Sequence, residues 1–242
     1  MNTSLLLRLM IWDVRVQSRE RIYLFTAITT ATFALVTALL PADAPPTVAT
    51  AILLLDPAVI GMGFVGGLVL LERSQHLPPA LAVTPAATVD YILAKLISFA
   101  ALTIAGGLAI AIVAWWPPSP VLLLRMAVAL TFTAVLAVLG GLVMVMTANS
   151  INHLISRAFP VSIVIDLPLL AHFGVVEGWL AWLLFGLSPG HAMLKALLWA
   201  ADPSAVSLPE LIYAFGYMGL ASVLLFRWAI RLHAHTIGRT DN

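Results

Sequence analysis

Runs of about 20 apolar residues recur along this chain, separated by short connectors that are polar or rich in proline. The hydrocarbon core of a bilayer is about 30 Å thick, and a helix of about 20 residues crosses it. Lipid offers no hydrogen-bond partner to an open backbone, so such runs cross the membrane as helices. We therefore predict an all-α polytopic membrane protein with six transmembrane helices. The expected spans cover residues 22–40, 49–71, 92–114, 121–147, 161–184 and 210–230.

The composition supports this fold class. Hydrophobic residues make up 62% of the 242 residues and charged residues only 10%, and the mean hydropathy is +1.04. Soluble domains carry about 25% charged residues, so we expect residues 1–242 to form a single transmembrane domain in a lipid bilayer. The formal net charge of +1 gives no reason to expect a nucleic-acid partner. The absence of cysteine excludes disulfide and thiol chemistry.

An amphipathic helix is expected before the first span, over residues 4–20. Apolar side chains recur there at steps of four, three and four, which places them on one stripe of a helix: Leu5, Leu9, Trp12 and Val16. Arg8 and Arg15 flank the stripe, a pattern typical of a helix in the membrane interface. A disordered basic leader is the alternative. A cleaved signal peptide is disfavoured because the apolar run at 22–40 is longer than a signal core.

The placement of arginine and lysine predicts the orientation in the membrane. Ten of the twelve lie near the termini or in the flanks of the 72–91 and 148–160 connectors, and only Arg125 and Lys195 lie on the opposite side. The positive-inside rule therefore places both termini in the cytoplasm. The long connector 185–209 is then outside, and part of it is expected to return to the interface as a short helix.

Glycines in the second span match a dinucleotide-binding pattern, Gly61-Met-Gly-Phe-Val-Gly66. That site needs a preceding strand and an acidic residue about 20 positions later, whereas this match lies inside a span. Gly63 and Gly67 instead form a G-x-x-x-G face that is expected to let another helix approach closely.

Other motifs of enzymes are incomplete in this sequence. Gly186-Leu-Ser-Pro-Gly190 matches the G-x-S-x-G nucleophile pattern, but the oxyanion hole uses the N–H of the residue after the serine, and Pro189 has none. We read it as an outer turn. His233 and His235 are too few to hold a metal without further ligands. No phosphate-binding loop is present, so we expect no catalytic residue, no metal site and no ATP site in this chain.

Ionisable side chains inside membrane spans cost a few kcal/mol each and usually face the bundle interior or a wet path. The candidates here are Asp56, Arg125, Asp166, His172 and Glu177. Asp56 lies about 10 Å and Arg125 about 6 Å from the outer surface, so the two can pair. Such a pair either holds two helices in register or moves substrate or protons. Asp166 is expected within reach of Lys95 or Arg157.

Two of these acids stand close to prolines, in the segments Asp56-Pro57 and Asp166-Leu-Pro168. Proline removes a helix hydrogen bond, and broken helices near the middle of a membrane mark the binding sites of many transporters. Two ordinary kinks are the alternative. Asp56 and Glu177 together favour a cationic cargo if this is a transport path.

The connector between the second and third spans resembles that of a known family. Glu72-Arg73, then Leu81 and Val83-Thr84-Pro85, then a span that opens at Tyr91-Ile-Leu-Ala-Lys95, resemble the cytoplasmic loop of type-2 ABC exporter permeases. The resemblance covers residues 72–95 and is greatest to small bacterial drug-export permeases of the fluoroquinolone type. This chain departs from the family at His76-Leu-Pro78, where the family has Gly-Thr-Leu.

The resemblance implies a permease subunit in the bacterial cytoplasmic membrane that exports a hydrophobic or amphipathic small molecule. It also implies a second permease subunit, identical or related, and a separate ABC ATPase that carries ATP and Mg²⁺. The residues expected to couple the ATPase to the spans are Glu72, Arg73, Leu81, Thr84 and Asp90. The alternatives are a loop that only anchors the chain at the interface, a permease for a lipid, a glycan or the haem-exporter B type of cargo, and an unrelated membrane channel or enzyme.

Overall fold

The computed structural model describes residues 3–41, 44, 46–75 and 88–237, and the side chains of all of these except 3, 4, 57–60 and 234–237. Every secondary-structure element in the described residues is a helix. The helices are α1 (Thr3–Arg19), α2 (Ile22–Ala38), α3 (Pro46–Pro57), the π-helix η1 (Ala58–Phe64), α4 (Val65–Ser74), α6 (Thr88–Ala114), α7 (Pro120–Met146), α8 (Ile151–Asp166), α9 (Leu169–His172), α10 (Gly178–Phe185), α11 (Pro189–Ala201), the 3₁₀ helix η2 (Pro203–Ala205) and α12 (Leu208–Ile237).

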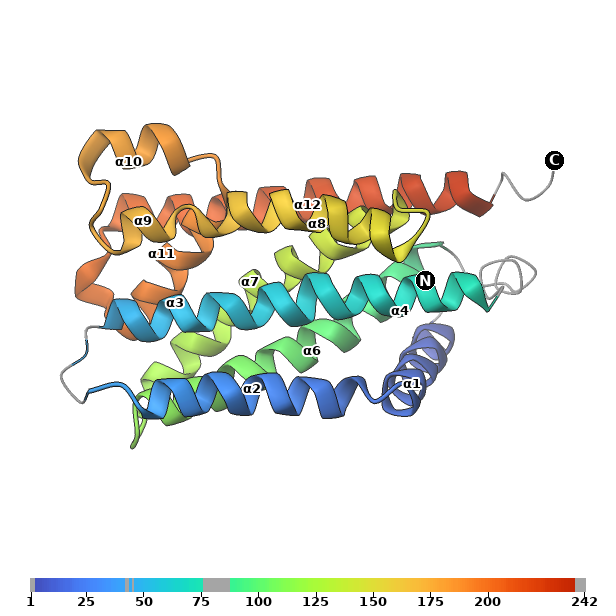
Figure 1. Cartoon of the computed structure of the whole chain (residues 1–242), viewed down its shortest axis with the longest axis horizontal. Coiled ribbons are helices and arrows are strands. Elements are labelled where there is room, and N and C mark those ends of the chain that lie inside the picture. Colours follow the sequence, from blue (N-terminus) through green and yellow to red (C-terminus); the bar gives the residue numbers. More distant parts are fainter. Residues whose placement is uncertain (1–2, 42–43, 45, 76–87, 238–242) are drawn as a thin grey trace.

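The long helices lie side by side and form one elongated bundle (Figure 1). In the described residues, five helical stretches are long and apolar enough to cross a membrane: Pro46–Ser74, Thr88–Ala114, Pro120–Met146, Ile151–His172 and Leu208–His233. A sixth is obtained if α1 and α2 are counted together. The architecture is therefore compatible with the expected polytopic helical membrane protein.

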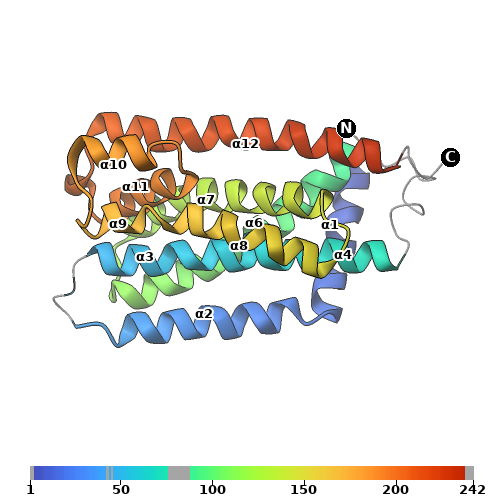
Figure 2. The ribbon, with the colours of Figure 1, turned by 45° about the horizontal axis from the view of Figure 1, so that its top comes forward.

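Helix α7 is the centre of the bundle. It packs against α6, α12, η1 and α11, and Figure 2 shows it between α12 and α3. Two apolar clusters lie along it, one around Leu130 and Leu197 and the other around Phe99 and Leu142. All four of these side chains are fully buried, and a buried leucine or phenylalanine stabilises a fold by about 1.5–3 kcal/mol.

The chain bends by 70° between α1 and α2. The bend is made at Arg21, which adopts a left-handed backbone conformation with φ 59°, while its N–H donates to the carbonyl of Ser18. The sequence Arg19-Glu20-Arg21 is too polar to continue a helix into hydrocarbon, so the polar turn ends α1 before α2 begins. As a result α1 lies across one end of the bundle (Figure 1).

The helix that corresponds to the fifth expected span differs from the expected range of 161–184. Helix α8 begins at Ile151, ten residues earlier, because the Ser150 hydroxyl accepts the N–H of His153 and caps its start. The helical stretch ends at His172, and Gly174 (φ 73°) then turns the chain. The apolar residues that follow form the separate helix α10, which projects from the end of the bundle (Figure 1). The sequence alone did not reveal this break because both sides of it are apolar.

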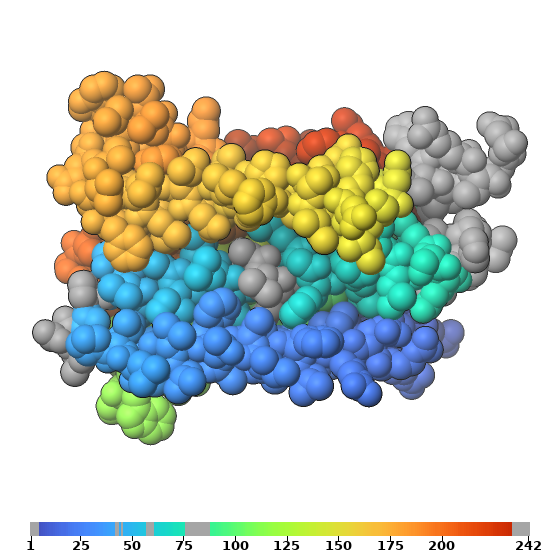
Figure 3. All heavy atoms as spheres, viewed as in Figure 1, coloured from blue at the N-terminus to red at the C-terminus, as the bar shows by residue number. Residues whose placement is uncertain are grey.

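The outer face of the bundle is apolar. Helices α8 and α12 are the least buried of the long helices, and α8 runs along the surface beside α3 and α4 in Figure 3. Its large apolar side chains Ile155 and Phe159 are exposed. In a membrane protein this surface faces lipid or another subunit, as the composition predicted.

Glycines permit a close crossing of η1 and α7, but not at the expected positions. A Cβ at Gly141 of α7 would lie 2.7 Å from the carbonyl oxygen of Gly61 and 2.8 Å from Cα of Met62, so η1 and α7 touch backbone to backbone. A Cβ at Gly63 or Gly67 would meet no atom within 4 Å in the described part of the chain. Within this chain the close approach that we expected at Gly63 and Gly67 is therefore made by Gly61 instead.

Candidate functional site

A buried network of charged groups joins three helices at the α1 end of the bundle. The ammonium group of Lys95 on α6 forms ion pairs with the carboxylates of Asp13 on α1 and Glu72 on α4. The side chains of all three residues are at most 3% exposed. Charges removed from water in this way are stable only when they are paired and hydrogen-bonded, so this cluster fixes the relative positions of α1, α4 and α6.

Neutral polar side chains complete the network. The Gln17 amide donates to Asp13 Oδ2 over 2.9 Å and to the hydroxyl of Ser98 over 3.0 Å. The Ser98 hydroxyl donates to Asp13, and the Tyr91 hydroxyl donates to Glu72 Oε2 over 2.8 Å. Both carboxylates thus accept hydrogen bonds in addition to their ion pairs with Lys95, which offsets part of the cost of burying them.

Two further long helices, α7 and α12, are attached to the same cluster. The imidazole of His233 on α12 stacks on the Tyr91 ring with centroids 4.7 Å apart. The guanidinium of Arg73 donates to the carbonyls of Val145 and Ala148, each over 3.0 Å, at the end of α7. Displacing α1 or the end of α4 would therefore disturb contacts to α6, α7 and α12 as well.

The sequence predicted part of this site. Glu72 and Arg73 are in it, but the Glu72 side chain is only 3% exposed, so Glu72 has no surface to offer a partner protein and instead positions its neighbours. Asp90 is buried in the first turn of α6, where a helix N-terminus stabilises an acid. Leu81 and Thr84 lie outside the described residues.

Five members of the network were missed: Asp13, Gln17, Tyr91, Lys95 as an ion-pair partner of the leader helix, and Ser98. A signal for them was present in the sequence. Asp13 and Gln17 are four residues apart and Lys95 and Ser98 three apart, so each pair shares one helix face. The expected apolar stripe of Leu5, Leu9, Trp12 and Val16 is only half-buried in the structure. Among the side chains of α1 that the structure describes, Asp13 and Gln17 are the buried ones, at 1% and 0% exposure, while Leu7 and Ile11 are exposed.

The expected pair of Asp56 and Arg125 is not formed. Among the described residues, Asp56 has no ion-pair partner; its Oδ1 accepts a long hydrogen bond of 3.5 Å from Thr30. Its carboxylate fits against α6 because position 106 is glycine, where a Cβ would lie 3.0 Å from Oδ2. Arg125 lies instead near Asp202, and it adds a small effect to the hydrogen bonds from Ser204 that lower the pKa of Asp202.

Asp166 also lacks the expected cationic neighbours. Lys95 is bound in the buried network, and Arg157 donates to the carbonyl of Thr147. Asp166 faces an apolar groove beside α8, and its Oδ1 has no hydrogen-bond partner in the described residues.

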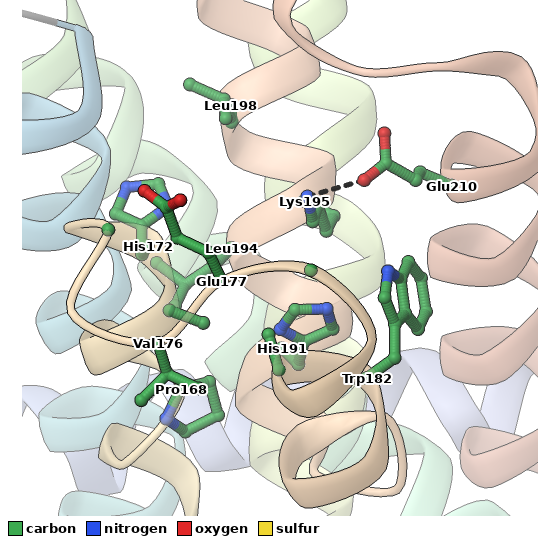
Figure 4. Close-up of a pocket in the computed structure, with 14 residues that line it drawn as sticks. Pro168, His172, Val176, Glu177, Trp182, His191, Leu194, Lys195, Leu198 and Glu210 are labelled. Atoms are coloured by element: carbon green, nitrogen blue, oxygen red, sulfur yellow. Dashed lines mark hydrogen bonds and ion pairs between the residues drawn. The ribbon is translucent and has the colours of Figure 1, made fainter.

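His172 and Glu177 are far from this network. They line a polar cavity at the opposite end of the bundle, together with His191 and Lys195 (Figure 4). The serine of the G-x-S-x-G segment lies near that end as well, but the Ser188 hydroxyl donates to the carbonyl of Val164 over 2.8 Å and not to an imidazole. The described residues contain no group of three or more side chains that could hold a metal ion.

The fold and these contacts define an all-helical protein with the character of a polytopic membrane protein. Comparisons with protein-family models, with curated protein sequences and with solved structures give no match.

Proposed function

We propose that this chain is the membrane-spanning permease subunit of an ATP-driven exporter of the type-2 ABC class. One observation supports this proposal above the others: Lys95 ties the leader helix α1 and the end of α4 to the start of α6 through ion pairs with Asp13 and Glu72. The segment that resembles the coupling loop of such permeases begins at Glu72 and ends at Lys95. The two residues at its ends are thus bound to each other.

In this proposal the buried network transmits the movement of a partner protein to the membrane-spanning helices. A partner that moves α1 or the 76–87 segment moves α4 and α6 together, because separating them would break buried ion pairs at a cost of about 3–5 kcal/mol. The partner shifts the bundle between its two orientations only if it binds them with different affinities. ATP and Mg²⁺ belong to that partner, because the chain has no phosphate-binding loop of its own.

The cargo in this proposal is a hydrophobic or amphipathic small molecule. Two grooves of about 500 and 510 Å³ lie on either side of α8, and apolar side chains such as Met62 and Met144 line both of them. Grooves of this size suit small molecules, and methionine adapts to cargo of different shapes. A permease of the same class for a lipid, a glycan or another cargo would share the coupling network and differ in these grooves.

The test is purification of the tagged chain from its native membrane in mild detergent, with mass determination of every copurified subunit. Because Glu72 is buried, its replacement would damage the bundle itself, so the variant is Leu81→Asp within the loop. We expect the wild type to retain an ATPase subunit and Leu81→Asp to lose it. The mass of the intact complex also gives the number of permease subunits.

The matched control is Leu187→Asp, the same substitution at a leucine that is 87% exposed at the opposite end of the bundle. It should retain the ATPase. A monodisperse wild-type protein that retains no ATPase, or equal retention by Leu81→Asp, would overturn the proposal and favour a channel or a membrane enzyme.

A further inference from the structure

A polar cavity of about 370 Å³ lies at the end of the bundle opposite the Lys95 network. It is enclosed by the segment from α9 to α10, by α11 and by the start of α12 (Figure 4). Its ionisable and aromatic side chains are His172, Glu177, Trp182, His191, Lys195 and Glu210. A cavity of this size admits a small organic ligand.

The positively charged side chain in the cavity already has a carboxylate partner. The Lys195 ammonium group lies 2.6 Å from Glu210 Oε1. The other oxygen of Glu210 accepts the N–H and the hydroxyl of Ser207, each over 2.8 Å. An anionic ligand would have to compete with Glu210 for Lys195, so the cavity does not favour anions.

The second carboxylate is free. Glu177 makes no hydrogen bond or ion pair with any other described side chain. With Lys195 paired to Glu210, Glu177 gives the side chains that line the cavity a formal net charge of −1. Unpaired charge in a partly enclosed site attracts a ligand of the opposite sign.

The two histidines add hydrogen-bond acceptors. His172 Nε2 lies 2.9 Å from the carbonyl oxygen of Thr47 and therefore donates to it, which leaves Nδ1 as the acceptor of a neutral ring. His191 is 4% exposed, and its Nε2 has no partner in the described residues. Burial and the nearby charge of Lys195 lower the pKa of His191 to about 4, so this ring is neutral at pH 7 and also offers one acceptor.

A buried polar atom without a partner costs about 1–3 kcal/mol, so a ligand that forms a hydrogen bond with the unsatisfied nitrogen of His191 would remove that cost. Figure 4 shows its ring beside Trp182, and the two ring centroids are 5.1 Å apart. The indole adds an aromatic surface that attracts cations. A free carboxylate, two imidazole acceptors and an aromatic ring all suit the same ligand chemistry.

We infer that this cavity binds a protonated organic amine, with Glu177 as the counterion and the imidazoles of His172 and His191 as hydrogen-bond acceptors. The amine comes either from a soluble molecule or from the headgroup of a lipid. The neighbouring helix α10 exposes the large apolar side chains Trp179 and Leu183, which places a lipid within reach of the cavity. This inference does not depend on an ATPase partner.

The experiment is calorimetric titration of the purified chain in detergent with ethanolamine, and with ethylene glycol as an uncharged counterpart. We expect saturable binding of ethanolamine only, and at least a tenfold loss of affinity in Glu177→Gln. Glu20→Gln, which removes the same charge at the other end of the bundle, should bind like the wild type. Equal binding by Glu177→Gln, or no binding of ethanolamine by a folded wild type, would overturn the inference.

Two further measurements separate the contributions. His191→Gln keeps a hydrogen-bond acceptor and should still bind ethanolamine, whereas His191→Phe should lose affinity for it. Equal binding of ethanolamine by both variants would exclude the imidazole of His191 from the site. The source of the amine is decided in lipid nanodiscs. If the ligand is a headgroup, phosphatidylethanolamine but not phosphatidylglycerol will raise the unfolding temperature of the wild type and abolish ethanolamine binding. If it is soluble, ethanolamine will bind equally in both lipids.

Discussion

The ammonium group of Lys95 forms an ion pair with the carboxylate of Asp13, a residue 82 positions earlier in the chain, and both side chains are only 2% exposed. The leader helix is therefore attached to the bundle through a polar contact, while its apolar residues Leu7 and Ile11 remain exposed. An interfacial helix held only by lipid would move independently of the bundle. This one is coupled to α6 by charge.

Replacing Lys95 with methionine should destabilise the protein strongly. The substitution keeps the volume of the side chain but leaves two buried carboxylates without a cation, and breaking such a group costs about 3–5 kcal/mol. Denaturant titration of the purified protein, followed by tryptophan fluorescence, measures the change in the free energy of unfolding.

Lys195→Met is the matched control for that variant. Lys195 also pairs with a carboxylate, but its side chain is 23% exposed, and partly exposed pairs contribute about 1 kcal/mol or less. If Lys95→Met lowers the free energy of unfolding no more than Lys195→Met does, the buried network does not hold α1, α4 and α6 together.

Gly141→Ala should destabilise the bundle by about 1–3 kcal/mol. The new methyl group would overlap the backbone of η1 at Gly61 and Met62, and backbone atoms cannot turn aside as a flexible side chain does. Gly67→Ala adds the same methyl group where no atom of the described residues lies within 4 Å, and it should cost nothing. Thermal unfolding of both variants in one detergent distinguishes them, and equal melting temperatures would contradict the crossing.

Arg21→Gly should leave the protein as stable as the wild type or more stable by up to about 1 kcal/mol. A residue with a Cβ pays about 1–2 kcal/mol for the left-handed conformation, in which Arg21 has φ 59°, and glycine does not. Arg21→Val should be less stable than either because it is β-branched. Arg15→Gly, in the interior of α1, should instead lose about 1 kcal/mol. Stabilisation by glycine at position 15 but not at 21 would place the turn elsewhere.

Acidification should destabilise the protein partly through His191. Burial lowers the pKa of this imidazole from 6.5 to about 4, so the unfolded chain binds a proton more readily than the folded one. The contribution is fully present above pH 6.5 and is lost as the pH falls towards 4, by about 1.4 kcal/mol per pH unit. Unfolding temperatures between pH 7.5 and 4.5 should therefore fall more steeply for the wild type than for His191→Gln. Parallel curves would show that His191 does not titrate in this range.

The features of the fold that depend on local chemistry could be predicted from the sequence. Long apolar runs became helices because a backbone in lipid has to satisfy its own hydrogen bonds. The second, third and sixth expected spans each fall within a long helical stretch, and the fourth exceeds its helix by one residue. The polar sequence at Arg19-Glu20-Arg21 ended α1. The fifth span was misplaced because Ser150 caps α8 and Gly174 turns the chain, and neither event interrupts the apolar pattern that defined the span.

Only the tertiary structure decided which polar groups meet. Asp56 and Arg125 have opposite charges and a similar expected depth in the membrane, yet their helices direct them to different neighbours. Lys95 instead pairs with Asp13, which lies 82 residues earlier in the chain. Depth along a helix follows from counting residues, whereas the partner of a side chain depends on how each helix is rotated and packed. That rotation is set by contacts between distant segments, such as the close crossing of Gly61 and Gly141, which no local pattern contains.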